Sequence, residues 1–163
     1  MRVVSRSGAL VSGKRHPVSS VTMTHYADAL ARRIVPDALQ VQVLLGTLLG
    51  AGRLVPAPDG FSLVLSLDAR HVWLSEWTYE RLAPLVPVPA RRDSRVEIRS
   101  APHPFFADLA ALLAHPARLR RVVGERALWL WATHQLVREC EREAGDACTC
   151  ARAAPPRSVW FAA

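Results

Sequence analysis

One short segment of the sequence carries a charge at every second position. In Arg95-Val96-Glu97-Ile98-Arg99, apolar residues alternate with two arginines and a glutamate. This alternation predicts a strand that turns Val96 and Ile98 toward a core and the charged residues outward. Guanidinium groups on such a face bind phosphates and the edges of guanine bases. The pattern is equally typical of a strand whose outer face is only solvated, so it leaves both interpretations open.

A second group of reactive side chains consists of His134, Cys140, Cys148 and Cys150. Thiolates with an imidazole suit zinc, but the spacing His-x5-Cys-x7-Cys-x-Cys matches no common zinc site. We therefore expect buried or idle thiols, with no metal and no other cofactor. Three cysteines do not form a disulfide framework, which favours a reducing, cytoplasmic compartment.

Length and composition predict one folded domain. The chain has 163 residues, half of them hydrophobic, which excludes a disordered solvating chain. Its net charge of +7 permits binding to nucleic acid. Lys14 is the only lysine among 21 basic residues, and such an arginine bias can follow from codon composition, so charge alone assigns no partner. The uncharged run at 38–52 is shorter than the ~20 residues that cross a bilayer, so we expect no membrane span.

The first half of the chain predicts an arm, two helices and a hairpin. Residues 1–23 show no periodicity and indicate a disordered basic arm, and a short helix is expected at 24–34. Pro36 and Asp37 open a second helix that the Gly-Ala-Gly sequence ends at Gly50. Two runs joined by a Pro/Asp/Gly turn at 56–60 then predict a β-hairpin.

The second half repeats this order. Asp68 is a suitable N-cap for a helix at 69–83, which Pro84 ends. A second hairpin is expected at 84–100, followed by helices near 103–115, 116–123 and 125–143. Residues 137–163 comprise the end of the last helix and an irregular tail. The predicted class is α+β, with helices on one side of an antiparallel sheet.

The segment LLGTLLGAGRL at 44–54 resembles the first motif of the LAGLIDADG homing endonucleases. Three later segments are similar to that family in the same order, the last at the place of the second motif: WLSEWTYERLAPLV (73–86), VEIRSAPHPFFADLAALL (96–113) and ERALWLWATHQL (125–136). The resemblance covers residues 37–136 of a domain at 24–136. It implies an α-ββ-α-ββ-α fold with the helices on one face of a curved antiparallel sheet that reads DNA with the other.

The resemblance also implies that two motif helices pack side by side. Gly46 and Gly50 are one helical turn apart, so they form a stripe of small residues that allows close approach. The equivalent positions of the second motif are Leu130 and His134, which we expect to be too bulky for such a contact. The chain therefore resembles one intact half-domain with a decayed second motif. Either a homodimer through the first motif helix or the last helix of the same chain would cover the stripe.

In active members of the family, an acid before the last glycine of each motif holds a divalent metal. Here Ala51 and Gln135 occupy those positions, and neither offers a carboxylate. We therefore predict a DNA-binding protein that has lost cleavage, with magnesium needed only if cleavage persists. The alternatives are a protein-interaction or structural domain that keeps only the fold and, less favoured, a residual endonuclease. The expected partner is double-stranded DNA, and the residues predicted to contact it are Arg53, Ser62, Ser66, Arg91, Arg92, Arg95 and Arg99.

Overall fold

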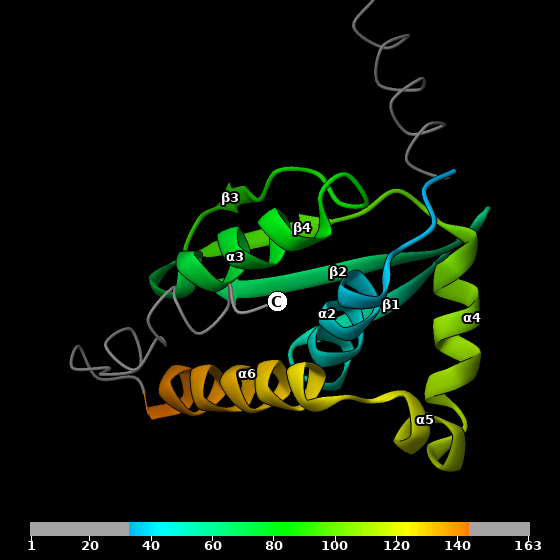
Figure 1. Ribbon diagram of the computed structural model, residues 1–163. Coiled ribbons are helices and arrows are strands. Elements are labelled where there is room, and N and C mark those ends of the chain that lie inside the picture. Colours follow the sequence, from blue (N-terminus) through cyan, green and yellow to red (C-terminus); the bar gives the residue numbers. More distant parts are fainter. Residues whose placement is uncertain (1–32, 144–163) are drawn as a thin grey trace, which may run out of the picture.

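The computed structural model describes residues 33–143, so the predicted arm, nearly all of the helix predicted at 24–34, and the tail after Glu143 lie outside the described residues. The described chain is a four-stranded antiparallel sheet with helices packed against it (Figure 1). The elements in chain order are α2 (Ala38–Leu49), β1 (Gly52–Ala57), β2 (Gly60–Asp68), a 3-10 turn (Ala69–His71), α3 (Val72–Leu82), β3 (Ala90–Arg92), β4 (Arg95–Arg99), α4 (Pro104–Leu113), α5 (Pro116–Val122) and α6 (Glu125–Glu143). This order confirms the predicted α+β class.

Two hairpins form the sheet, in the strand order β1-β2-β4-β3. The first hairpin has a shorter turn than predicted, because Pro56 and Ala57 still pair with Phe61 and Gly60. Pro56 is compatible with β1 because β1 is an edge strand, where a missing N–H need not break a ladder. The second hairpin turns at Asp93, which has a φ of 52°. Both hairpins thus lie where the alternating apolar pattern predicted them.

Helix α2 begins and ends at the predicted residues. The Asp37 carboxylate accepts a hydrogen bond from the Gln40 backbone N–H at 2.7 Å, and the Gln40 side chain accepts one from the Asp37 N–H at 3.1 Å. This reciprocal pair is a capping box, which satisfies two N–H groups that the first turn leaves without helical partners. At the other end, the Gly50 N–H donates to the carbonyls of Gly46 and Thr47.

The core lies between one face of the sheet and the helices. The inward residues of β2 and β4 are fully buried together with apolar residues of α2, α3, α4 and α6: Leu63, Leu65, Leu67 and Ile98 with Leu44, Leu45, Leu74, Phe106 and Leu130. Helix α2 contacts both β1 and α6, so it lies between the sheet edge and the last helix (Figure 1). Among residues 33–143, no helix has the length and apolar character that a membrane crossing requires.

Candidate nucleic-acid interface

The face of the sheet opposite the core carries four exposed arginines. Residues directly opposite each other on antiparallel strands share a face. The register places Arg53 and Arg99 on either side of Val64, and Arg92 opposite Arg95. Because Val96 and Ile98 point into the core, the alternate residues Arg95 and Arg99 point away from it. We call the set of Arg53, Arg92, Arg95 and Arg99 the arginine face.

Two of these arginines are held by neighbouring side chains. Arg95 donates from Nε to the Ser66 hydroxyl at 2.8 Å and from Nη2 to the Ser66 carbonyl at 2.7 Å. Arg99 donates from Nε to the Glu97 carboxylate at 3.3 Å. The two short bonds to Ser66 orient the Arg95 guanidinium, and both arginines keep further N–H donors. Glu97 offsets part of the positive charge at Arg99.

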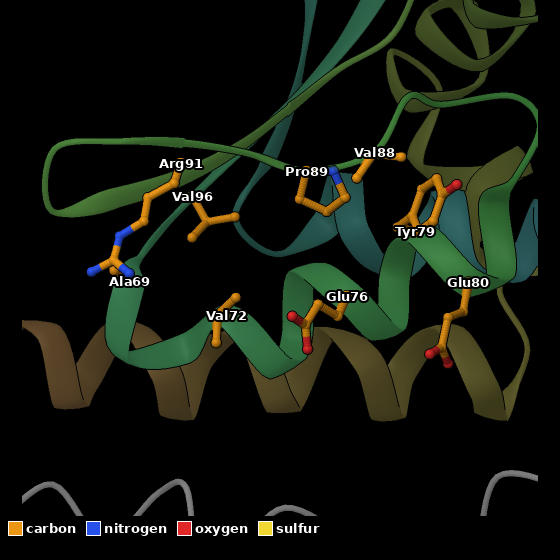
Figure 2. A pocket seen from close by; sticks show the side chains of 9 residues that line it. All are labelled: Ala69, Val72, Glu76, Tyr79, Glu80, Val88, Pro89, Arg91 and Val96. Carbon is orange, nitrogen blue, oxygen red and sulfur yellow. The ribbon is translucent and has the colours of Figure 1, made fainter.

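Arg91 lies on the other face of the sheet. It pairs with the buried Val96, and directly paired residues point the same way. Arg91 lines a cavity of about 380 Å³ between α3 and the strands of the second hairpin. Figure 2 shows its side chain with those of Val72 and Glu76, which also line the cavity. The sequence predicts a DNA contact for both Arg91 and Arg92, but neighbouring residues of one strand face opposite ways. We therefore leave Arg91 out of the arginine face.

The middle of the predicted reading face is closed to solvent. Ser62 is 7% exposed and Val64 is 1% exposed, although both alternate with the core residues of β2. Strand β2 is central, and Arg53 and Arg99 are the direct neighbours of Val64 on its two sides, so their aliphatic stems flank it. Ser62 is too buried to serve as a contact residue, and the Ser66 hydroxyl accepts a hydrogen bond from Arg95.

The glycine stripe of α2 packs against α6 of the same chain. A Cβ at Gly46 would lie 2.7 Å from the carbonyl oxygen of Ala127 and 2.8 Å from the Leu130 Cβ. A Cβ at Gly50 would lie 2.5 Å from the His134 Cβ. The expectation that Leu130 and His134 are too bulky for close contact is therefore wrong, because the glycines alone provide the space. The alternative of a homodimer through this stripe is not what the structure shows, since α6 already fills it.

The two positions that the resemblance matches to metal-binding acids lie close together, where α2 ends beside the middle of α6. Ala51 follows Gly50 and Gln135 follows His134, and Gly50 contacts His134. Ala51 packs partly buried against the core, and Gln135 is half-buried. Within residues 33–143, no three His, Cys, Asp or Glu side chains are close enough together to hold a metal ion.

His134 is enclosed between the two helices. Its side chain is fully buried, and neither ring nitrogen has a hydrogen-bond partner within the described chain. Burial lowers the pKa of His134 to about 4, because the charged imidazolium loses its hydration there. The imidazole therefore acts as an apolar filler at neutral pH. Of the other members of the candidate zinc group, Cys148 and Cys150 lie outside the described residues.

Comparisons with known proteins identify the fold. No family model matches the sequence, and no curated protein matches it. The structure is similar to that of the homing endonuclease I-WcaI bound to its DNA recognition sequence, with a TM-score of 0.50 at 15% sequence identity. The similarity covers 73% of this chain and 58% of that chain, so this protein matches little more than half of the endonuclease. The predicted LAGLIDADG homing-endonuclease-like fold is thus confirmed.

Proposed function

We propose that this protein binds double-stranded DNA through the arginine face of its sheet and does not cleave it. The observation that carries the proposal is the alignment of four exposed arginines on one side of the sheet. Arginines so placed neutralise phosphates and donate to guanine edges. The homing endonuclease of similar fold is itself bound to DNA, which supports the same partner here.

The absence of carboxylates at Ala51 and Gln135 supports loss of cleavage. A divalent cation that activates water between two phosphates needs anionic oxygen ligands. An alanine methyl group offers none, and the Gln135 amide is neutral. Binding through the arginine face needs no metal, so the proposed activity is independent of magnesium.

The binding test is fluorescence anisotropy of labelled random duplexes titrated with the full chain over a series of salt concentrations. The logarithm of the binding constant should fall linearly with the logarithm of the salt concentration. The slope of this line should be about −0.9 for each neutralised phosphate. Arg95→Ala and Arg99→Ala should each reduce that slope by about one. Arg91→Ala is the matched control: it removes the same charge from the neighbouring strand but from the opposite face, so its slope should equal that of the native chain.

Two results would contradict the proposal. If Arg91→Ala lowers the slope as much as Arg95→Ala does, the positive charge acts without regard to face. If no duplex binds at low salt, the domain has kept the fold for another purpose, such as contact with a protein. A separate incubation of supercoiled plasmid with magnesium tests cleavage, where accumulation of nicked circles would refute the loss of activity.

A further inference from the structure

Helix α6 is apolar on two opposite sides. Ala127, Leu130 and Val137 are buried toward the core. On the other side, Leu128 is 50% exposed and Leu136 is 55% exposed. A helix that packs on one side only carries polar residues on the other, so this pattern is typical of a helix covered on both sides.

The exposed apolar residues of α6 form one continuous surface. Leu128, Ala132 and Leu136 are separated by four residues each, which places them in a row along the helix. Trp131, which is 41% exposed, flanks Leu128 on the adjacent turn. We call these four residues the outer face of α6. Three of the seven large apolar residues that are exposed within the described chain belong to it.

We propose that the C-terminal segment of the same chain, residues 144–163, covers the outer face of α6. This segment begins directly after Glu143, the last residue of α6. It carries a run of large apolar residues, Val159-Trp160-Phe161, after a stretch dominated by small and polar residues and two prolines. The run therefore has the composition that the outer face of α6 would bind.

The length of the segment suits this arrangement. Leu128 lies roughly 22 Å from Glu143 along the helix, at about 1.5 Å per residue. The residues between Glu143 and Val159 can span roughly 50 Å when extended, so the chain can turn back and reach both ends of the outer face. A tethered segment has an effective concentration in the millimolar range, which favours it over a second copy at micromolar protein.

The test is a double-mutant cycle in the full chain, measured by urea denaturation. One side of the cycle is Leu136→Ser, and the other is Trp160→Ser combined with Phe161→Ser. If the C-terminal segment contacts the outer face of α6, Leu136→Ser should lower the folding equilibrium constant more in the native chain than in the chain with Trp160→Ser and Phe161→Ser. The difference should be at least about fivefold. Val122→Ser on α5 is the matched control, because Val122 is 41% exposed but lies outside α6. Its effect should be equal in both backgrounds.

The same tail variant should raise the fluorescence of an added apolar dye severalfold, because it uncovers the outer face. Additive effects in the cycle, or unchanged dye fluorescence, would overturn the proposal. Light scattering should show a monomer, and a dimer that Leu136→Ser dissociates would overturn it in favour of a second copy. If Leu136→Ser fails to fold, the milder Leu128→Ala completes the cycle with the same expected coupling.

Discussion

The contact between Gly46 and α6 gives a mutational prediction whose sign is opposite to the usual one. In an exposed helix interior, replacing glycine by alanine stabilises a protein by about 1 kcal/mol. At Gly46 the new Cβ would lie 2.7 Å from the Ala127 carbonyl oxygen and 2.8 Å from the Leu130 Cβ. Carbon atoms in good contact are about 3.5–4.0 Å apart, so α2 and α6 must separate by roughly 1 Å.

That separation sets the size of the effect. Overpacking a core costs about 1–3 kcal/mol, and the upper end applies because the nearest atom belongs to the backbone and cannot rotate away. After subtracting the gain of about 1 kcal/mol in helix propensity, we expect Gly46→Ala to reduce the free energy of unfolding by about 2 kcal/mol. With a urea dependence of about 2 kcal/mol per M, the denaturation midpoint should fall by about 1 M.

Urea denaturation followed by tryptophan fluorescence measures this midpoint. Ala111→Gly, at an exposed position of α4, measures the difference in helix propensity between alanine and glycine without a packing effect. It should lower the free energy of unfolding by about 1 kcal/mol. Adding Ala127→Gly should not rescue Gly46→Ala, because the closest contact is the carbonyl oxygen that glycine keeps. A Gly46→Ala chain as stable as the native protein would refute the close packing of the two helices.

Three further outcomes follow from the described contacts. Glu97→Gln should raise DNA affinity about fivefold at low salt, because it removes about 1 kcal/mol of repulsion from phosphates beside Arg99; unchanged anisotropy titrations would contradict this. Because burial lowers the pKa of His134 to about 4 in the folded chain, from an ordinary histidine pKa of 6.5, the unfolded chain binds more protons between these values. The free energy of unfolding should therefore fall by roughly 3 kcal/mol as pH drops from about 6.5 to 4, and His134→Leu should reduce this dependence in urea titrations at several pH values. Asp37→Ala should cost about 1 kcal/mol in the same denaturation assay by removing the cap on the Gln40 N–H, and a neutral effect would show that water replaces it.

Local sequence signals predicted the elements well because their causes are local. Asp37 and Gly50 mark the ends of α2 through hydrogen bonds within a few residues of each end. The alternation from Phe61 to Leu67 predicts β2 because strand side chains alternate between faces. The same alternation places Arg91 and Arg92 on opposite faces of the short strand β3.

Features that depend on distant parts of the chain were harder to predict. Ser62 has the alternating position of an outward residue, yet it is 7% exposed, and nothing in the residues beside it signals that burial. Gly46 and Gly50 signalled a close contact, yet their sequence positions do not say which helix fills it. The burial of His134 depends on the space left by Gly50, which no feature of the residues around His134 reveals.

The pairing of α2 with α6 also constrains how the chain folds as it is synthesised. Gln42 on α2 donates to the Val122 carbonyl and accepts from the Gly124 N–H, contacts that join positions 80 and 82 residues apart. Each hairpin, by contrast, closes through a two-residue turn and can form as soon as its strands leave the ribosome. The glycine stripe of α2, Gly46 and Gly50, thus stays uncovered until α6 has been made, and chaperones and other nascent chains can contact it. A transcript that ends before α6 would encode a chain whose glycine stripe is permanently uncovered. Such truncated chains are therefore candidates for aggregation and rapid degradation.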